Sequence, residues 1–386
     1  MHKISILFVI PGYSLGGTTT SLASLLNSEF SSKYDVEVFA INRRSYSHPD
    51  IIQYDIGLNG LTTAFNTDFS TFSKKERLKY LPIKLLKQLK PLSNSLKNWI
   101  IARTVKQIED RNHYDYVVAF QEENTTKFTS RFTNANKIAW IHCDYDKSFG
   151  IDVNELGLYN QYKNIVCVSD YTRKSFLGRY PSLDEKTVAI HNLFDGDLVL
   201  EKSKGAIDDS RFDNYYFTIV SLGRVSEVKR FYLIPEMAAK LRDMNVAFRW
   251  YIIGGRNNNR DFQRVIDAIS QYGVENEVIY LGSKSNPYPY LKTADLLVST
   301  SMSEACPMVF NEAKLLHVPI LSSDFGSAFE FIEEGKDGYI TSIEDMPTKL
   351  AELVQNREKL KLNKSANSYR DTNNSILKQL YSLFTL

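Results

Sequence analysis

The sequence predicts an α/β fold made of two doubly wound domains, each with a parallel sheet and helices on both of its faces. The chain has 386 residues, which is too long for one ordinary hydrophobic core. Short apolar runs alternate with segments of helical spacing, as expected when parallel strands are joined by helices. This alternation occurs in two series, separated by a polar stretch, 195–213, without a clear period.

The first series begins with a buried strand at 4–10, then a loop marked by Pro and Gly, and a helix over 18–30. Its other predicted strands lie at 34–42, 114–120, 137–142 and 164–169. The second series has predicted strands at 214–225, 247–255, 276–282, 294–300 and 318–324.

We therefore expect Rossmann-like domains at 1–194 and 214–367, joined by a linker at 195–213 and followed by a helical tail at 368–386. Ligands bind open parallel sheets at the carboxyl ends of their strands. Two such domains facing each other would place these ends around a central cleft. The loops that follow the strands are therefore the places to look for a site.

Composition and charge exclude several classes. The charged fraction of 24% and the net charge of +2 are globular values that demand no nucleic acid or other acidic partner. Cys143, Cys167 and Cys306 lack metal-ligand spacing, and their odd number argues against a disulfide framework. The apolar run at 4–10 is too short for a signal-peptide core, and no run is long enough to span a membrane. We expect a cytoplasmic protein.

A basic loop follows the first strand of the second domain. The stretch SLGRVSEVKRF, 221–231, carries Arg224 and Lys229. A diphosphate leaving group needs fixed positive charge where its negative charge develops, and Arg and Lys both supply it. The alternative is an ordinary solvated basic loop.

Two acids follow the predicted strand 294–300. Glu304 lies just before a helix that begins near Pro307, and Glu312 lies about a turn and a half into that helix. The helix start favours anions, while the two carboxylates could accept hydrogen bonds from sugar and ribose hydroxyls. The alternative is a capping Glu304 and a solvent-facing Glu312.

The first domain offers weaker signals. Gly16 and Gly17 follow its first strand and would let a phosphate or sugar approach the backbone, although the full dinucleotide fingerprint is absent. His142 ends a strand, where its imidazole could bond a sugar hydroxyl. The acidic stretch 144–146 resembles a metal-binding D-x-D, but we predict no metal because the paired-domain setting does not suit that motif.

Together these motifs resemble the retaining glycosyltransferases of family 4, which have the GT-B fold. The resemblance covers nearly the whole chain, from ILFVIPGYSLGGT through IVCVSDYTRKSF, LGRVSEVKRF and WYIIGG to the long stretch that starts at VIYLGSKSNPYPYLKTADLLVSTSMSEACPMVFNEAK. Two glutamates with seven residues between them, in that setting, are its most specific feature. The chain departs from the family at 305–307, where Ala-Cys-Pro replaces small glycine-rich residues, and this leaves the sugar contacts open.

The resemblance implies a role for each matching position. Arg224 and Lys229 would neutralise the donor diphosphate, Glu304 would hold hydroxyls of the transferred sugar, and Glu312 would bind the ribose. His142 would sit beside the transferred sugar. Further donor contacts are implied at Gly16, Gly17, Gly254, Gly282, Lys284, Pro307, Met308 and Val309. The tail helix would cross back to the first domain.

The implied activity is metal-independent transfer of a hexose, with retention, from a nucleoside diphosphate sugar to a saccharide or lipid-linked acceptor. UDP is preferred because it is the family's commoner donor nucleotide. Such a reaction would serve cell-surface polysaccharide or glycoconjugate synthesis. The alternatives are a non-catalytic glycan-binding partner of the same fold, and a nucleotide-sugar epimerase or hydrolase.

One basic amphipathic segment predicts membrane contact. Residues 74–106 carry ten basic residues against one acid, with Leu, Ile and Trp interleaved. Such segments lie on anionic membranes, where each cation contributes about 1 kcal/mol. We therefore expect peripheral binding at the inner face of the plasma membrane. The alternative is a helix with an ordinary solvated basic face.

Overall fold

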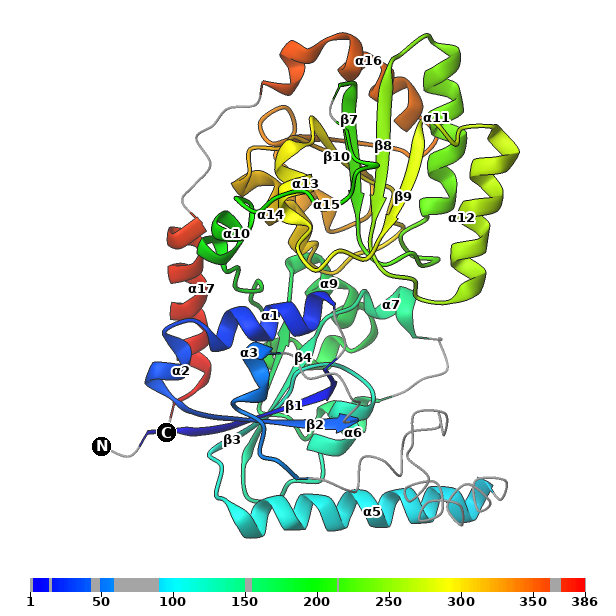
Figure 1. The fold of residues 1–386 in the computed structure, drawn as a ribbon. Coiled ribbons are helices and arrows are strands. Elements are labelled where there is room, and N and C mark those ends of the chain that lie inside the picture. Colours follow the sequence, from blue (N-terminus) through cyan, green and yellow to red (C-terminus); the bar gives the residue numbers. More distant parts are fainter. Residues whose placement is uncertain are drawn as a thin grey trace. The chain divides into compact units, whose positions relative to one another are not determined.

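The structure, a computed structural model, describes residues 3–13, 16–42, 49–58, 90–149, 155–213, 215–361 and 369–385. The chain forms two compact units (Figure 1). Unit 1 comprises Met1–Val168, Thr172–Leu193 and Ile376–Leu386, and unit 2 comprises Ser169–Tyr171 and Phe194–Ser375. Among the helices described, none is long and apolar enough to cross a membrane.

Unit 1 is built on a six-stranded parallel sheet in the order β2-β1-β3-β4-β5-β6. Its strands are β1 (Ser5–Gly12), β2 (Asp35–Asn42), β3 (Tyr116–Ala119), β4 (Asn136–Ile141), β5 (Asn164–Cys167) and β6 (Thr187–Ala189). Its helices are α1 (Gly17–Leu26), α2 (Phe30–Lys33), α3 (Pro49–Ile52), α5 (Lys90–Arg111), α6 (Asn124–Thr129), α7 (Tyr145–Ser148), α8 (Leu156–Tyr159), α9 (Asp170–Arg179) and η3 (Pro181–Lys186).

Unit 2 repeats this architecture with the order β12-β11-β10-β7-β8-β9, again all parallel. Its strands are β7 (Phe217–Leu222), β8 (Phe248–Ile253), β9 (Val278–Gly282), β10 (Leu296–Ser299), β11 (Ile320–Ser323) and β12 (Gly338–Thr341). Its helices are α10 (Gly196–Lys202), η4 (Phe231–Leu233), α11 (Ile234–Asp243), α12 (Asn259–Tyr272), α13 (Tyr288–Thr293), α14 (Met308–Leu315), α15 (Ala328–Phe331), α16 (Met346–Gln355) and η5 (Arg357–Leu360), and α17 (Tyr369–Leu383) begins in this unit.

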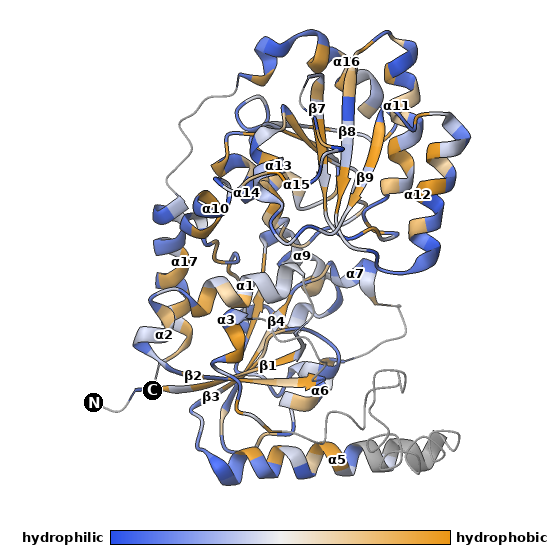
Figure 2. Ribbon diagram, in the orientation of Figure 1, coloured by the Kyte–Doolittle hydropathy of each residue, from blue (hydrophilic) through white to orange (hydrophobic). Residues whose placement is uncertain are grey.

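Most residues of the strands in both sheets are apolar and buried, as expected when helices cover both faces of a parallel sheet (Figure 2). Trp250 in β8 is fully buried, and its indole N–H donates to the Ser221 hydroxyl at 3.0 Å. Ser221 in turn donates to the carbonyl of Val298 at 2.7 Å. The buried polar groups of Trp250 and Ser221 are therefore both hydrogen-bonded within the core of unit 2.

The predicted fold class is confirmed, with two differences in detail. The edge strands β6 and β12 were not predicted, because three or four residues give too little period to recognise. The second difference concerns 195–213, which we expected to be a linker. It is a folded part of unit 2 and contains α10, whose first turn is capped by the Asp195 carboxylate.

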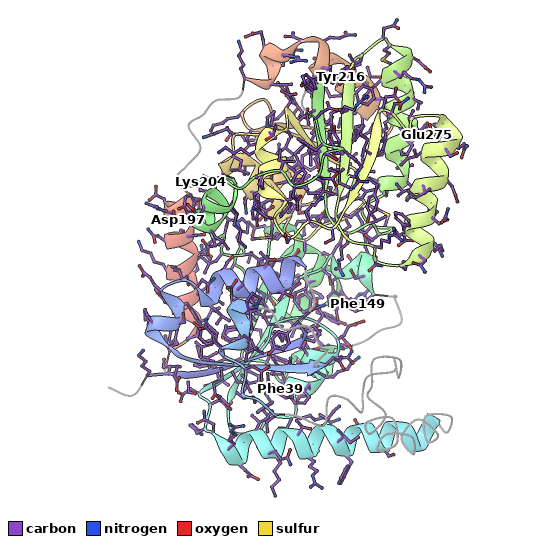
Figure 3. The ribbon with its side chains drawn as sticks, viewed as in Figure 1. Phe39, Phe149, Asp197, Lys204, Tyr216 and Glu275 are labelled. Carbon is purple, nitrogen blue, oxygen red and sulfur yellow. The ribbon has the colours of Figure 1, made fainter. Side chains whose placement is uncertain are left out.

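The segment 195–213 packs on the unit 2 core through a few apolar side chains. Val199 is buried in the unit 2 core, and the ring of Phe212 lies 4.4 Å from that of Tyr251. Asp197 and Lys204, labelled in Figure 3, are exposed and give the segment the polar character that suggested a linker. An amphipathic segment this short shows no clear period in the sequence.

The last helix, α17, is divided between the units. Residues 369–375 belong to unit 2 and Ile376–Leu386 to unit 1. In unit 1, the ring of Phe384 packs 5.4 Å from Phe30 and 5.1 Å from Tyr116. The tail is therefore part of the unit 1 core.

Candidate functional site

Glycines shape the loops at the carboxyl ends of the unit 2 strands. Gly254 follows β8 with φ +154°, and a Cβ there would lie 1.8 Å from the carbonyl oxygen of Gly223. Gly282 ends β9 with φ +79° and accepts the Gly254 N–H at 2.9 Å. Only glycine allows the loops after β7 and β8 to approach this closely. The fold itself thus requires glycine at 254, whatever ligand binds.

The basic and acidic motifs converge. Lys229, from the loop after β7, donates its Nζ to the carboxylate of Glu304, from the loop after β10. The Ser301 hydroxyl donates to the same carboxylate oxygen at 2.7 Å. β7 and β10 are neighbours in the sheet, so residues 75 positions apart in sequence meet at one edge. The side chains are 20% and 16% exposed, which leaves the pair accessible to a ligand.

The backbones of these two loops are bound to each other. The Thr300 hydroxyl donates to the carbonyl of Lys229 at 2.7 Å, and the Arg230 guanidinium donates to the carbonyl of Thr300 at 2.8 Å. The Met302 N–H donates to the carbonyl of Val228 at 2.7 Å. Lys229 and Glu304 are therefore placed by fixed backbone rather than by their own attraction alone.

Arg224 is exposed on the same loop as Lys229. Within the described residues no hydrogen bond or ion pair engages its guanidinium. The neighbouring Val225 N–H donates to the carbonyl of Gly255 at 2.8 Å, which fixes the backbone beside it. An anchored backbone with a solvent-accessible guanidinium suits recognition of phosphate oxygens.

Helix α14 begins directly behind Glu304. Pro307 takes the N-cap position in an extended conformation, so the helix starts at Met308 rather than at Pro307. No side chain caps the first turn, where Met308 and Val309 lie. The Ser327 hydroxyl donates to the carbonyl of Glu304 at 2.6 Å and fixes the approach to the helix. The helix start is therefore available to an anion.

Glu312 lies in α14 and is partly buried rather than solvent-facing. Burial raises the pKa of its carboxyl to about 7, while the Tyr288 hydroxyl and the charge of Lys229 act in the opposite direction. The Tyr288 hydroxyl lies 3.4 Å from Glu312 Oε1. A carboxylate with so little hydration is prepared to accept hydrogen bonds from a ligand.

The structure does not bring Lys284 to this group. Its Nζ pairs with Asp209 at 2.8 Å and with Asp208 at 3.5 Å, both from the segment expected to be a linker. Hydrogen bonding to Arg211 and Lys284 lowers the pKa of Asp209. The charge of Lys284 is thus already neutralised within the fold.

At the corresponding edge of unit 1, His142 follows β4 and lies between aromatic rings. The ring of Phe120 is 4.8 Å away and that of Trp140 is 6.5 Å away. Burial lowers the pKa of His142 to about 3, so the imidazole is neutral at physiological pH. Within the described part of the chain its Nε2 is buried and has no hydrogen-bond partner.

Glu122 was not predicted. It follows β3, is 7% exposed, and its carboxylate accepts the backbone N–H of His142. Burial raises the pKa of Glu122, and hydrogen bonds from the backbone of His142 and Cys143 oppose that rise. The sequence signal was available, since Glu122 comes directly after a predicted strand. Its partners, however, are backbone groups of the loop that follows β4.

Gly16 and Gly17 lie at the start of α1 in unit 1. Gly16 is fully extended, and a Cβ at Gly17 would meet no atom within 4 Å. The fold therefore does not require glycine at Gly17, in contrast to Gly254.

The acids at 144–146 have structural partners. Asp144 is 4% exposed and accepts the Ser175 hydroxyl at 2.8 Å, while Asp146 lies 3.8 Å from Arg179. Among the described residues, no group of three or more His, Cys, Asp or Glu could hold a metal ion.

Known proteins match both sequence and fold. Residues 205–373 match the family model described as glycosyl transferases group 1. Over residues 205–373 the chain is similar to the group 1 glycosyltransferases. The predicted family resemblance is confirmed at this level, and residues 205–373 include Arg224, Lys229, Glu304 and Glu312.

Two curated relatives illustrate the distance within the family. An uncharacterized glycosyltransferase of Methanocaldococcus jannaschii, MJ1059, is 23% identical over 209 residues, which is 53% of this chain and 50% of the relative. The poly(ribitol-phosphate) alpha-N-acetylglucosaminyltransferase of Staphylococcus aureus is 24% identical over 237 residues, 59% of this chain and 46% of the relative. The matches thus span about half the length of these relatives.

Solved glycosyltransferases share the whole fold. Anabaena Alr3699/HepE, solved in complex with UDP-glucose, superposes with a TM-score of 0.71 at 17% identity, covering 98% of this chain and 100% of its own. TarM superposes with a TM-score of 0.71 at 16% identity, covering 100% and 99%. The fold is GT-B.

Proposed function

We propose that the chain transfers a sugar from a nucleoside diphosphate sugar, preferably a UDP-sugar, to a saccharide or lipid-linked saccharide. The product would serve cell-surface polysaccharide or glycoconjugate synthesis. The observation that carries this proposal is the convergence of Lys229 and Glu304 beside the exposed Arg224. The UDP and UDP-glucose complexes of the Anabaena protein favour a UDP-sugar as donor.

Charge neutralisation is the main contribution of unit 2. Arg224 and Lys229 bind the diphosphate and stabilise the negative charge that develops as the nucleotide leaves. Lys229 exchanges Glu304 for phosphate when the donor binds, which frees the Glu304 carboxylate for sugar hydroxyls. Two cations at the diphosphate perform the role that a divalent metal performs in other transferases, so we propose a metal-independent reaction.

The remaining site residues orient the donor. The backbone at Pro307, Met308 and Val309 receives phosphate or sugar at the start of α14. Glu312 accepts hydrogen bonds from the ribose. Gly254 and Gly282 form the loops around the base, and Lys284, which pairs with Asp208 and Asp209, lies in the loop that follows Gly282.

Unit 1 contributes uncharged groups. The imidazole of His142 bonds a hydroxyl of the transferred sugar, and the backbone at Gly16 and Gly17 receives the donor. The acceptor attacks from the face from which the nucleotide departs, through an oxocarbenium-like transition state, so the anomeric configuration is retained. None of these steps requires a proton to pass through His142.

The test is turnover of UDP-sugars with and without saccharide acceptors, in the presence of EDTA, with NMR assignment of the product anomer. We expect acceptor-dependent UDP release and a retained anomer. Turnover without an acceptor would indicate an epimerase or hydrolase. Nucleotide-sugar binding without turnover would indicate a non-catalytic partner. Loss of activity in EDTA that is restored by Mg²⁺ would contradict metal independence.

We also propose that 74–106 binds the inner, anionic face of the plasma membrane and places the enzyme in the cytoplasm beside a lipid-linked acceptor. Residues 74–89 lie outside the described residues, so only α5 can be assessed. Its exposed face carries Trp99, which is 56% exposed, with Arg103 5.4 Å from the ring. Ile100 and Val105 are buried on the opposite side. Trp and Arg are residues suited to a membrane interface.

The membrane proposal is tested by co-sedimentation with phosphatidylglycerol vesicles at low salt. We expect binding that weakens with salt, and a loss of binding when Lys84, Lys87 and Lys90 are neutralised together. A matched triple neutralisation of Lys336, Lys359 and Lys361 in unit 2 is the control. Equal binding of parent and Lys84/Lys87/Lys90 variant would contradict the proposal.

A further inference from the structure

The loop between β9 and α13 is held firmly by the segment that precedes β7. Asn286 donates from Nδ2 to the carbonyl of Lys202 at 2.8 Å, and Lys284 pairs with Asp209 at 2.8 Å. The Asn286 side-chain oxygen accepts the N–H of Tyr288 at 3.3 Å. Tyr288 therefore begins α13 from an anchored backbone.

The side chain of Tyr288 is directed at Glu312. Its hydroxyl lies 3.4 Å from Glu312 Oε1, and its ring packs against the apolar core of unit 2. Hydrogen bonds in ligand-free sites are commonly long and shorten when the ligand is bound. Because Glu312 is partly buried, the hydroxyl replaces some of the water that would otherwise solvate the carboxylate.

We propose that Tyr288 is a positioning residue, whose hydroxyl keeps Glu312 oriented and ionised so that the carboxylate can accept hydrogen bonds from the diol of a nucleoside ribose. This inference rests on the proposed role of Glu312 as the ribose ligand. It adds a residue to which no function has been assigned.

The charges around Glu312 agree with this role. Burial raises the pKa of Glu312 to about 7, and the Tyr288 hydroxyl and Lys229 hold it below the value that burial alone would set. Burial, followed by the charge of Glu312, raises the pKa of Tyr288, so its hydroxyl remains a donor.

Other charged groups on neighbouring elements act elsewhere. The charge of Asp195, the residue before α10, contributes to the raised pKa of Tyr288. Asp197 and Glu201 of α10 line a cavity with Leu316, which follows the last turn of α14. Tyr288 and Lys229 are therefore the groups in the described structure that favour ionised Glu312.

The test compares Tyr288→Phe, which removes only the hydroxyl, with the parent. The NMR signal of the Glu312 carboxyl carbon is identified as the signal that disappears in Glu312→Gln. Its chemical shift is followed against pH in the ligand-free protein. We expect the midpoint to rise by roughly one pH unit in Tyr288→Phe. UDP affinity should then fall roughly eightfold at pH 6.5 and less than about twofold at pH 9, because the variant is ionised again at high pH.

Tyr290→Phe is the matched control, since Tyr290 lies on the same helix and its hydroxyl contacts Asp208 instead. It should move neither the midpoint nor the pH profile. An unchanged midpoint in Tyr288→Phe, or equal loss of UDP affinity at pH 6.5 and pH 9, would overturn the inference. If the parent binds no UDP, the proposed function fails, while the ligand-free titration still decides whether Tyr288 controls Glu312.

Discussion

The two sheets share a topology, but the loops at their carboxyl ends treat charge in opposite ways. In unit 2, Lys229 and Glu304 form an accessible ion pair, with Arg224 exposed on the same loop. In unit 1, Glu122 is almost completely buried, and burial keeps His142 neutral. The carboxyl edge of the unit 2 sheet carries charged side chains that a ligand can reach. The corresponding edge of unit 1 keeps its ionisable side chains buried.

This difference teaches how one architecture can serve two parts of a substrate. A diphosphate needs cations whose own partners can be exchanged, and the partly exposed Lys229–Glu304 ion pair provides one. A neutral sugar needs fixed hydrogen-bonding groups, and a buried imidazole held by its backbone provides one without attracting anions. We therefore expect substitutions at the charged edge of unit 2 to lower activity, and substitutions at the buried edge of unit 1 to lower stability as well.

The largest effect is expected at the charged edge. Lys229→Ala should lower kcat/KM for sugar transfer by roughly 10²–10³-fold, because a cation is lost from the developing diphosphate. Acceptor-dependent UDP release measures it. Lys240→Ala is the control, since Lys240 is an exposed lysine of the same unit that pairs with Glu236. A fall in kcat/KM of less than threefold in Lys229→Ala would contradict the role proposed for the charged edge of unit 2.

At the buried edge, Glu122→Ala should destabilise the fold as well as the activity. Backbone N–H groups that bond the Glu122 carboxylate would lose their acceptor, at a cost of about 1–3 kcal/mol. Urea unfolding followed by circular dichroism measures this cost, with the exposed Glu185→Ala as control. In a His142→Ala background, Glu122→Gln should lower activity no further if Glu122 acts through His142. Additive losses would show an independent role.

Glu312 gives a pH-dependent prediction. Burial raises its pKa from 4.5 to about 7. Between these pH values the native protein therefore binds a proton that the unfolded chain has released. Ionised, buried Glu312 thus lowers stability as pH rises through that range. Glu312→Gln should raise Tm by a few degrees at pH 8 and by less at pH 5. A stabilisation that is greater at pH 5 would contradict the burial of this carboxyl.

The glycines give the smallest but most discriminating effect. Gly17→Ala should leave Tm unchanged within about 1 °C, since its Cβ meets no atom within 4 Å, yet it should weaken donor binding. Gly254→Ala should instead destabilise unit 2, because its Cβ would overlap the Gly223 carbonyl. Differential scanning calorimetry beside UDP titration separates these outcomes. A clearly lowered Tm in Gly17→Ala would show that the fold itself requires glycine there, and would contradict a ligand role for Gly17.

Much of this organisation could be predicted from the sequence. The short apolar runs indicated most strands, and the family resemblance implied that Lys229 and Glu304 serve one donor. What failed depended on partners distant in sequence. The ion pairs of Lys284 with Asp208 and Asp209 were not predicted, because these two acids were assigned to a linker. Glu122 went unnoticed because its partners are backbone groups of the loop after β4, which a residue pattern does not reveal.

The most direct test of the central claim is UDP affinity, measured by isothermal titration, in one variant from each edge. Arg224→Ala with Lys229→Ala, made together, should weaken UDP binding at least about 100-fold, the loss of two charge-assisted phosphate contacts. Glu122→Gln, at the buried edge, should leave UDP affinity within about twofold, a few tenths of a kcal/mol. Retained UDP binding in the double variant, together with a large loss in Glu122→Gln, would show that unit 1 rather than unit 2 recognises the nucleotide. That result would contradict the account.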